Sequence, residues 1–182
     1  MRIISGRARG TKLYSPKNDN IRPTSDKIKE SIFNILQPIT PEAVVLDLFA
    51  GSGGIGLEFA SRGAKKVYFV DNSRDSIDLI RKNIAKCRFE DQSIVMNLDF
   101  EAALSVARRD NIRFDYIFID PPYAAFKNMQ LMDRIFDDKL ITDGGVIILE
   151  VEKDENPEFN KTGISLKEKI YGRTKIIIIT GG

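Results

Sequence analysis

The chain has 182 residues, the size of a single domain, and its 42% hydrophobic and 30% charged residues are typical of a folded protein. It has no His and one Cys, which excludes His-dependent catalysis, an internal disulfide and a His- or Cys-cluster metal site. The net charge is only +2, but residues 1–30 hold eight Lys or Arg against three acids, so this leader carries +5 and the remainder −3.

The first 40 residues are predicted to form a basic extension. Short apolar runs at 2–5 and 11–14 flank the turn sequence GRARG, which predicts a hairpin. Apolar residues at helical spacing over 28–36 predict an amphipathic helix that ends before Pro38. A basic leader on an acidic body is typical of nucleic-acid-binding proteins, although a solvated tail would show the same charge. The side chains that we expect to contact nucleic-acid phosphates are Arg7, Arg9, Lys12 and Arg22.

From Ala43 onward, strand and helix patterns alternate along the chain. Five apolar runs predict buried strands at 43–49, 66–71, 93–99, 114–120 and 144–151, with four helices between them. Two later runs, 164–170 and 174–180, predict a terminal antiparallel hairpin. This order predicts an α/β, doubly wound, Rossmann-like sheet over residues 41–182, with residues 1–40 as the N-terminal extension.

A glycine-rich loop follows the first predicted strand. Gly51, Gly53 and Gly56 satisfy G-x-G-x-x-G, and Asp71 ends the next strand about 20 residues further on. Such glycines let a ligand approach the backbone, and the acid accepts hydrogen bonds from ribose hydroxyls. We therefore expect a nucleoside-containing cofactor. Asp47, just before the loop, would repel a pyrophosphate and attract a cation, which favours S-adenosylmethionine.

Acidic residues recur where successive strands end, at Asp47, Asp71, Asp99 and Asp120. One such acid is usually a cap or turn residue, but the carboxyl ends of parallel strands meet in one crevice at the switch point of the sheet. We expect Asp71 to accept from the ribose. We expect Asp99 to accept from the adenine amino group, with Phe100 beside the ring.

The motif Asp120-Pro121-Pro122-Tyr123 follows the fourth strand. The two prolines stiffen the turn and remove two backbone donors, so the Asp120 carboxylate and the Pro121 carbonyl remain as fixed acceptors. Two acceptors beside an aromatic ring suit a planar base with an exocyclic amino group, on which Tyr123 can stack. We expect these four residues to be the catalytic ones.

These motifs together resemble a known family. DLFAGSGGIGLE, VDNS, NLD and DPPY are similar to the Rossmann-like, S-adenosylmethionine-dependent amino-methyltransferases, and RIISGRARGTKL with RPTSDKIKESIFNIL resembles the bacterial 16S rRNA guanine-N2 methyltransferase family. The resemblance covers nearly the whole chain and is weakest after Val151. It implies methylation of an exposed guanine in small-subunit rRNA, free or in a ribosomal particle, and places Thr24 and Ser25 near the methionine end of the cofactor.

The resulting hypothesis is a cytoplasmic, monomeric methyltransferase with no metal and no membrane segment. Its expected cofactor-binding residues are Thr24, Ser25, Asp47, Phe49, Gly51, Ser52, Gly53, Gly56, Asp71, Asn72, Asp99 and Phe100. Three alternatives stay open. A DNA adenine-N6 methyltransferase would need a target-recognition region for which the chain has no room. An NAD-dependent oxidoreductase would explain the glycines but not Asp47 or DPPY. An RNA-binding protein without catalytic activity would not need an intact DPPY motif.

Overall fold

The computed structural model describes residues 1–15, 26–36, 38–121, 131–159 and 161–181. Its centre is a seven-stranded sheet with the order β3-β2-β1-β4-β5-β7-β6. The strands are β1 (Val44–Leu48), β2 (Lys66–Asp71), β3 (Ser93–Asn97), β4 (Phe114–Ile119), β5 (Ile141–Glu152), β6 (Ser165–Tyr171) and β7 (Thr174–Thr180). Strands β1 to β5 are parallel, whereas β7 is antiparallel to both β5 and β6.

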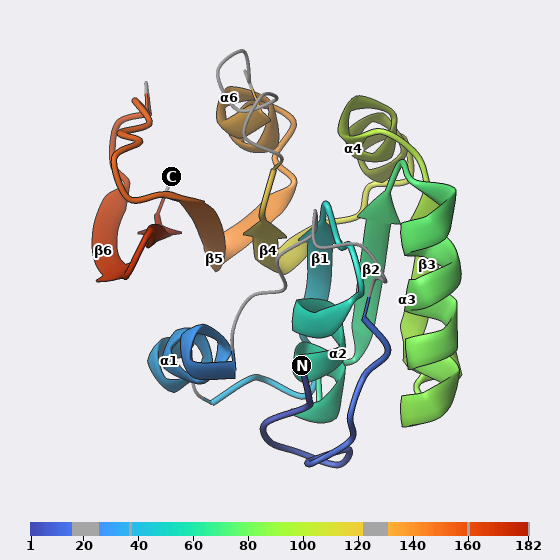
Figure 1. Ribbon diagram of the computed structural model, residues 1–182. Helices are drawn as coiled ribbons and strands as arrows, with labels where there is room; N and C mark the ends of the chain where they lie inside the picture. Colours follow the sequence, from blue (N-terminus) through green and yellow to red (C-terminus); the bar gives the residue numbers. More distant parts are fainter. Residues whose placement is uncertain (16–25, 37, 122–130, 160, 182) are drawn as a thin grey trace.

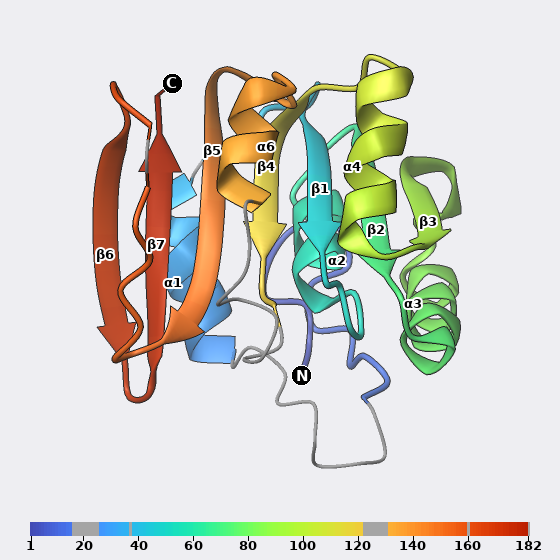
Figure 2. The ribbon, with the colours of Figure 1, turned by 90° about the horizontal axis from the view of Figure 1, so that it is seen from above.

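Helices cover both faces of the sheet (Figures 1 and 2). Helices α1, α2 and α3 pack on one face, and α4 and α6 pack on the other. Their bounds are α1 (Asp26–Leu36), α2 (Gly54–Ser61), α3 (Arg74–Cys87), α4 (Phe100–Arg109) and α6 (Leu131–Asp137), with a short 3-10 turn η1 (Glu90–Gln92). The predicted doubly wound, mostly parallel sheet with a terminal antiparallel hairpin is confirmed.

The central strands are apolar on both sides because both sides are covered. In β1, Val45 packs in the core on the α1–α2–α3 face, and Leu46 and Leu48 pack in the core on the α4–α6 face. In β4 and β5, Phe118 and Ile148 likewise belong to the first core. This alternation decides from which face each functional side chain emerges at the end of its strand.

The N-terminal segment is hydrogen-bonded to α2 through the buried side chain of Glu58. Arg2 and Lys12 form an antiparallel bridge, which confirms that the two runs pair, and Ile3 between them is fully buried. The Glu58 carboxylate accepts hydrogen bonds from the N–H groups of Ile4 at 2.8 Å and Ser5 at 3.0 Å. It also pairs with Lys29 of α1 at 3.9 Å and Arg62 at 2.8 Å. Glu58 therefore joins the leader, α1 and the sheet domain.

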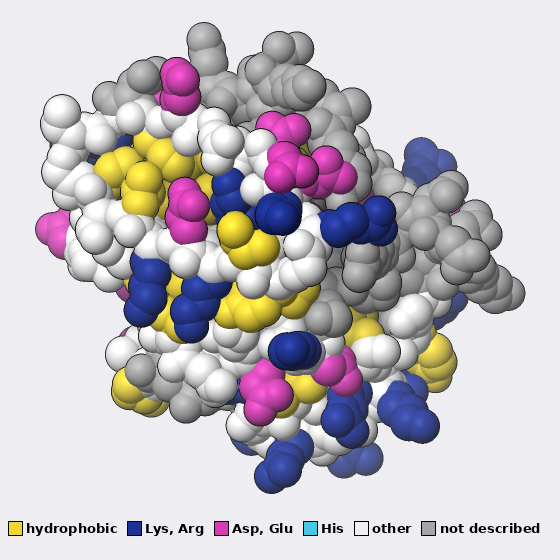
Figure 3. All heavy atoms as spheres, turned by 60° about the vertical axis from the view of Figure 1, so that its left-hand side comes forward, with side chains coloured by type: hydrophobic (Ala, Val, Ile, Leu, Met, Phe, Trp, Pro, Cys, Tyr) yellow, Lys and Arg dark blue, Asp and Glu magenta, His cyan; other side chains and the backbone are white. Residues whose placement is uncertain are grey.

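The edge strand β6 is exposed along its length. Leu166 and Ile170 are half exposed, and the charged residues Lys167, Glu168 and Lys169 between them discourage pairing with another chain. Figure 3 looks towards this side of the molecule and shows basic, acidic and apolar side chains interspersed. Among the described residues, no helix is long and apolar enough to cross a membrane.

Candidate active site

The site lies where the strand order reverses, between β1 and β4. These strands are neighbours in the sheet, yet the chain after β1 enters α2 on one face and the chain after β4 leads towards α6 on the other (Figure 2). Such a switch point opens a crevice outside the carboxyl ends of the strands. The glycine loop and Asp120 therefore occupy the two sides of the position where doubly wound sheets bind ligands.

The glycine loop needs its glycines for two reasons. Gly51 and Gly53 have φ of 56° and 77°, in the left-handed region that other residues adopt at a cost. Gly56 lies in α2 against the sheet, and a Cβ there would come within 2.3 Å of the Phe69 ring and 2.9 Å of Asp47 Oδ2. The predicted pattern is confirmed as a tight turn followed by close helix–sheet packing.

Asp47 lies beneath the loop and not at its mouth. Its side chain is only 2% exposed, and its Oδ2 accepts a hydrogen bond from the Gly56 N–H at 2.8 Å. Burial raises the pKa of Asp47 to about 8, and the hydrogen bond only partly offsets this rise. Asp47 therefore supports the first turn of α2, and its expected contact with a cationic ligand stays a prediction.

Asp71 joins the end of β2 to the glycine loop. One carboxylate oxygen accepts from the Gly51 N–H at 2.8 Å, and the other accepts from the Ser73 N–H at 2.8 Å. Each carboxylate oxygen has a second lone pair, so Asp71 can still accept from two ribose hydroxyls. The neighbouring Asn72 is exposed at the same strand end.

Asp99 caps α4, accepting a hydrogen bond from the Ala102 N–H at 2.8 Å. Asp99 therefore has the usual role of an acid at a strand end, that of a helix cap. Its contact with adenine stays a prediction. Next to it, the half-buried rings of Phe49 and Phe100 lie with centroids 5.8 Å apart, inclined by 45°. Phe49 has φ of 64°, which costs a residue with a side chain about 1–2 kcal/mol. The surrounding structure offsets this cost, and an aromatic ring lies at the end of β1.

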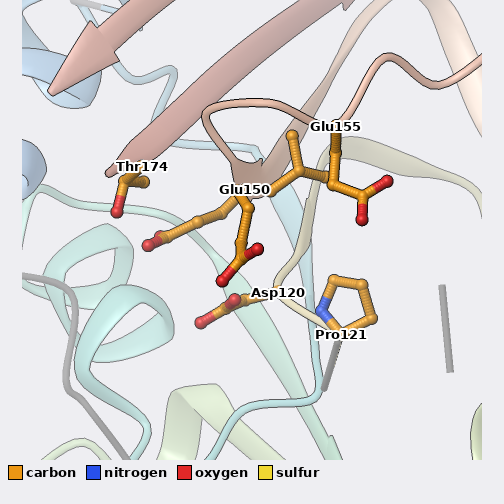
Figure 4. A pocket seen from close by; sticks show the side chains of 7 residues that line it. Asp120, Pro121, Glu150, Glu155 and Thr174 are labelled. Carbon is orange, nitrogen blue, oxygen red and sulfur yellow. The ribbon is translucent and has the colours of Figure 1, made fainter. Parts of the chain in front are cut away.

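Asp120 and Pro121 line a pocket at the ends of β4 and β5 (Figure 4). Burial, the negative charge of Glu150 and that of Asp47 raise the pKa of Asp120 well above its ordinary value. A carboxyl with so perturbed a pKa in a crevice is typical of a functional site.

Sequence reasoning missed Glu150, which faces Asp120 across the pocket. The strand-end rule that selected four aspartates applies equally to the end of β5 and could have found it. The polar stretch after Val151 also contributes to the pocket, through Glu152 and Glu155. The Lys175 ammonium holds this stretch in place by donating to the Glu155 carbonyl at 2.7 Å.

The predicted RNA contacts on the leader differ in how far their side chains contact the rest of the protein. Arg7, Arg9 and Lys12 are all exposed. The guanidinium of Arg7, however, donates to the Gln92 side chain and lies 5.1 Å from the centroid of the Phe89 ring, so it also anchors the leader. Arg9 lies in the turn, and Lys12 lies at the bridge with Arg2.

The leader also reaches the glycine loop through Asn83, a fully buried residue of α3. Its amide donates to the carbonyls of Ser52 at 2.9 Å and Tyr14 at 3.0 Å, and its oxygen accepts from the Tyr14 N–H at 2.7 Å. Five predicted site residues lie outside the described part of the chain: Thr24, Ser25, Arg22, Pro122 and Tyr123.

Residues 1–180 match the model of the family described as conserved hypothetical protein 95. The chain belongs to this family. A relative, the ribosomal RNA small subunit methyltransferase D of Haemophilus influenzae, is 34% identical over 176 residues, covering 94% of this chain and 89% of its own. The resemblance drawn from the motifs is confirmed, and the near full-length match to this relative supports a methyltransferase.

Two solved structures carry the same fold. The hypothetical protein TTHA0928 of Thermus thermophilus is 28% identical, with a TM-score of 0.84 and coverage of 98% of both chains. SMU.776, a structure complexed with SAH, is 17% identical with a TM-score of 0.68, over 88% of this chain and 50% of that one, and its likeness is one of fold alone. The NAD-dependent oxidoreductase considered from the glycine loop is not supported by these relatives.

Proposed function

We propose that this protein transfers a methyl group from S-adenosylmethionine to the exocyclic N2 of a guanine in small-subunit rRNA. The observation that carries the proposal is the placement of Asp120 and Pro121 at the switch point, beside the glycine loop. The name of the Haemophilus relative supports the choice of rRNA as substrate.

The residues around the loop fit this cofactor. Asp71 has spare lone pairs for ribose hydroxyls, and Phe49 and Phe100 offer an aromatic surface for adenine. Thr24, Ser25, Ser52 and Asn72 complete the proposed binding set.

When bound, S-adenosylmethionine supplies a methyl group on a sulfonium sulfur, which keeps the electron pair of the broken C–S bond. The Asp120 carboxylate and the Pro121 carbonyl accept the two N–H bonds of the guanine amine and so point its lone pair at the methyl carbon. The nitrogen becomes acidic as its bond to carbon forms. Asp120, whose pKa is raised, can then take the proton that leaves the nitrogen.

Pro122 and Tyr123 complete the proposed catalytic motif, with Tyr123 stacking on a base that has left its own stack. The proposed phosphate contacts are Arg7, Arg9, Lys12 and Arg22. In this scheme, residues 1–40 are the part of the chain that binds RNA, and residues 41–182 carry the chemistry.

The role of Asp120 is tested by labelled methyl transfer onto small subunits that lack the modification. Asp120→Asn keeps the size of the side chain but weakens the acceptor, and we expect at least a hundredfold loss of kcat/KM. The matched control is Asp143→Asn, because Asp143 pairs with exposed Arg113 at the opposite end of β5 and should not affect the rate. Near-normal turnover by Asp120→Asn would contradict the assignment.

A further inference from the structure

The pocket beside Asp120 presents hydrogen-bond acceptors. Its described polar lining residues are Asp120, Glu150, Glu152, Glu155 and Thr174. Pro121 adds a carbonyl and has no N–H to donate. Among these described lining residues there is no Lys or Arg, so Thr174 is the only side chain that donates when the acids are ionised. A planar ligand that fits must bring N–H donors of its own.

Glu150 is aligned with Asp120 by the sheet. Ile119 of β4 pairs with Leu149 of β5, so the next residue on each strand lies at the same level. Both side chains emerge on the face of Phe118 and Ile148, two positions before them, because successive residues of a strand alternate. In Figure 4 the two carboxyl groups point towards one another across the pocket.

This arrangement matches one edge of guanine. Its ring N1–H and its exocyclic amine are adjacent donors, whereas adenine has an acceptor at N1 beside its amine. An ionised carboxylate facing N1 is attracted by an N–H and repelled by a lone pair. A second carboxylate next to the one that holds the amine therefore distinguishes the two purines.

We propose that Glu150 is a specificity-determining residue, which accepts the N1–H of the target guanine while Asp120 and the Pro121 carbonyl hold its N2 amine. This inference rests on the proposed function, because it names how the same site recognises its base. It assigns a role to a residue outside the DPPY motif.

The first test needs no variant. Small subunits are rebuilt with 2-aminopurine at the mapped target position, since this base keeps the 2-amino group but has an acceptor at N1. The wild-type protein should methylate guanine with a kcat/KM about tenfold to a hundredfold higher than 2-aminopurine. Equal rates on the two bases would show that N1–H is not recognised and would overturn the inference.

The second test is the Glu150→Gln variant. A glutamine amide can rotate to donate to the N1 lone pair, so the preference for guanine over 2-aminopurine should fall at least tenfold. Glu150→Asp, which keeps the charge, should retain the preference with a lower rate. The matched control is Glu168→Gln on exposed β6, which should behave as the wild type. A preference unchanged in Glu150→Gln would contradict the assignment.

The outcomes separate this inference from the proposed function. If the wild-type protein places no methyl group on N2 of guanine, the proposed function fails and the inference fails with it. If it forms N2-methylguanine but accepts 2-aminopurine equally, only the role of Glu150 is lost. If Glu150→Gln does not fold, the wild-type comparison of the two bases decides alone.

Discussion

The Asp71 carboxylate and the Gly51 backbone N–H are joined by a 2.8 Å hydrogen bond, which ties the end of β2 to the glycine loop after β1. The two residues are about 20 positions apart, the interval that the dinucleotide-type fingerprint predicts. The bond fixes the loop that would contact the cofactor, while the same carboxylate keeps lone pairs for ribose hydroxyls. Asp71 thus both shapes and lines the proposed binding site.

We therefore expect Asp71→Ala to weaken S-adenosylmethionine binding by at least tenfold, because both the loop support and the ribose acceptor are removed. Isothermal titration of the purified protein measures the change. Asp78→Ala, on an exposed position of α3, is the matched control and should bind as the wild type. Unchanged affinity in Asp71→Ala would remove Asp71 from the site.

Asp47 makes the stability of the cofactor-free protein depend on pH. Its pKa is about 8 in the folded state against an ordinary 3.8, so between these values the folded protein holds a proton that the unfolded chain releases. Stability therefore falls as pH rises through this window, by up to about 1.4 kcal/mol per pH unit. Asp47→Asn keeps an acceptor for the Gly56 N–H and removes the charge.

Urea unfolding at several pH values should show Asp47→Asn gaining on the wild type steadily between pH 5 and pH 8, with no further gain above that range. A difference in the free energy of unfolding that is the same at every pH would show that Asp47 does not titrate in this range.

Glu58 should matter far more to folding than an exposed acid. Glu58→Ala leaves the buried Lys29 ammonium without the carboxylate that it pairs with, and leaves two leader N–H groups without an acceptor. We expect a loss of about 3–5 kcal/mol in the free energy of unfolding. Glu42→Ala, which removes the exposed pair with Lys65, should cost less than about 1 kcal/mol. Equal losses in the two variants, measured by urea unfolding, would contradict this account of the leader.

The pH dependence of methyl transfer should reflect the pairing of Asp120 and Glu150. The proposed mechanism needs an ionised Asp120, so kcat/KM should rise with pH as its raised pKa is passed. Glu150→Gln removes one like charge, which lowers the pKa of Asp120 and moves the rise to lower pH. Glu152 and Glu155 line the pocket in both proteins, and Asp47, which holds a proton below its raised pKa of about 8, adds negative charge only above it. An unmoved midpoint would mean that Glu150 does not act on Asp120.

The leader should give RNA binding its salt dependence. Three phosphate contacts predict a slope of log K against log salt of about −2 to −3. The double variant Arg9→Ala, Lys12→Ala should reduce this slope by about 1.5 to 2, whereas Arg109→Ala on α4 should not change it. Filter binding over a salt series provides the measurement, and a flat wild-type slope would rule out the leader as an RNA contact.

Much of the fold was predictable because the strands are short, apolar and separated by clear breaks. The bounds of β2 and β7 agree with the sequence prediction. Strand β5 begins at Ile141, three residues before the predicted start at Gly144. Gly144 and Gly145 lie inside the strand, where the register with β4 shifts.

The site was only partly predictable, because the direction of a side chain depends on packing between distant segments. The pattern of acids at strand ends predicted the position of the crevice. It did not predict that the Asp47 side chain is buried beneath the glycine loop. The strand-end rule applies to Glu150 as well, but no local pattern shows that its carboxyl group faces Asp120, because a strand buried on both faces has no polar alternation. The anchoring of Arg7 depends on Gln92, 85 positions away, and no local pattern predicts it.

The central claim is tested most directly by identifying the methylated nucleoside. Small subunits lacking the modification are incubated with the protein and labelled S-adenosylmethionine, and the rRNA is digested and separated by mass spectrometry. The account predicts label in N2-methylguanosine at one position, and none with the Asp120→Asn variant. Label in N6-methyladenosine, or none in N2-methylguanosine from the active wild-type protein, would contradict it.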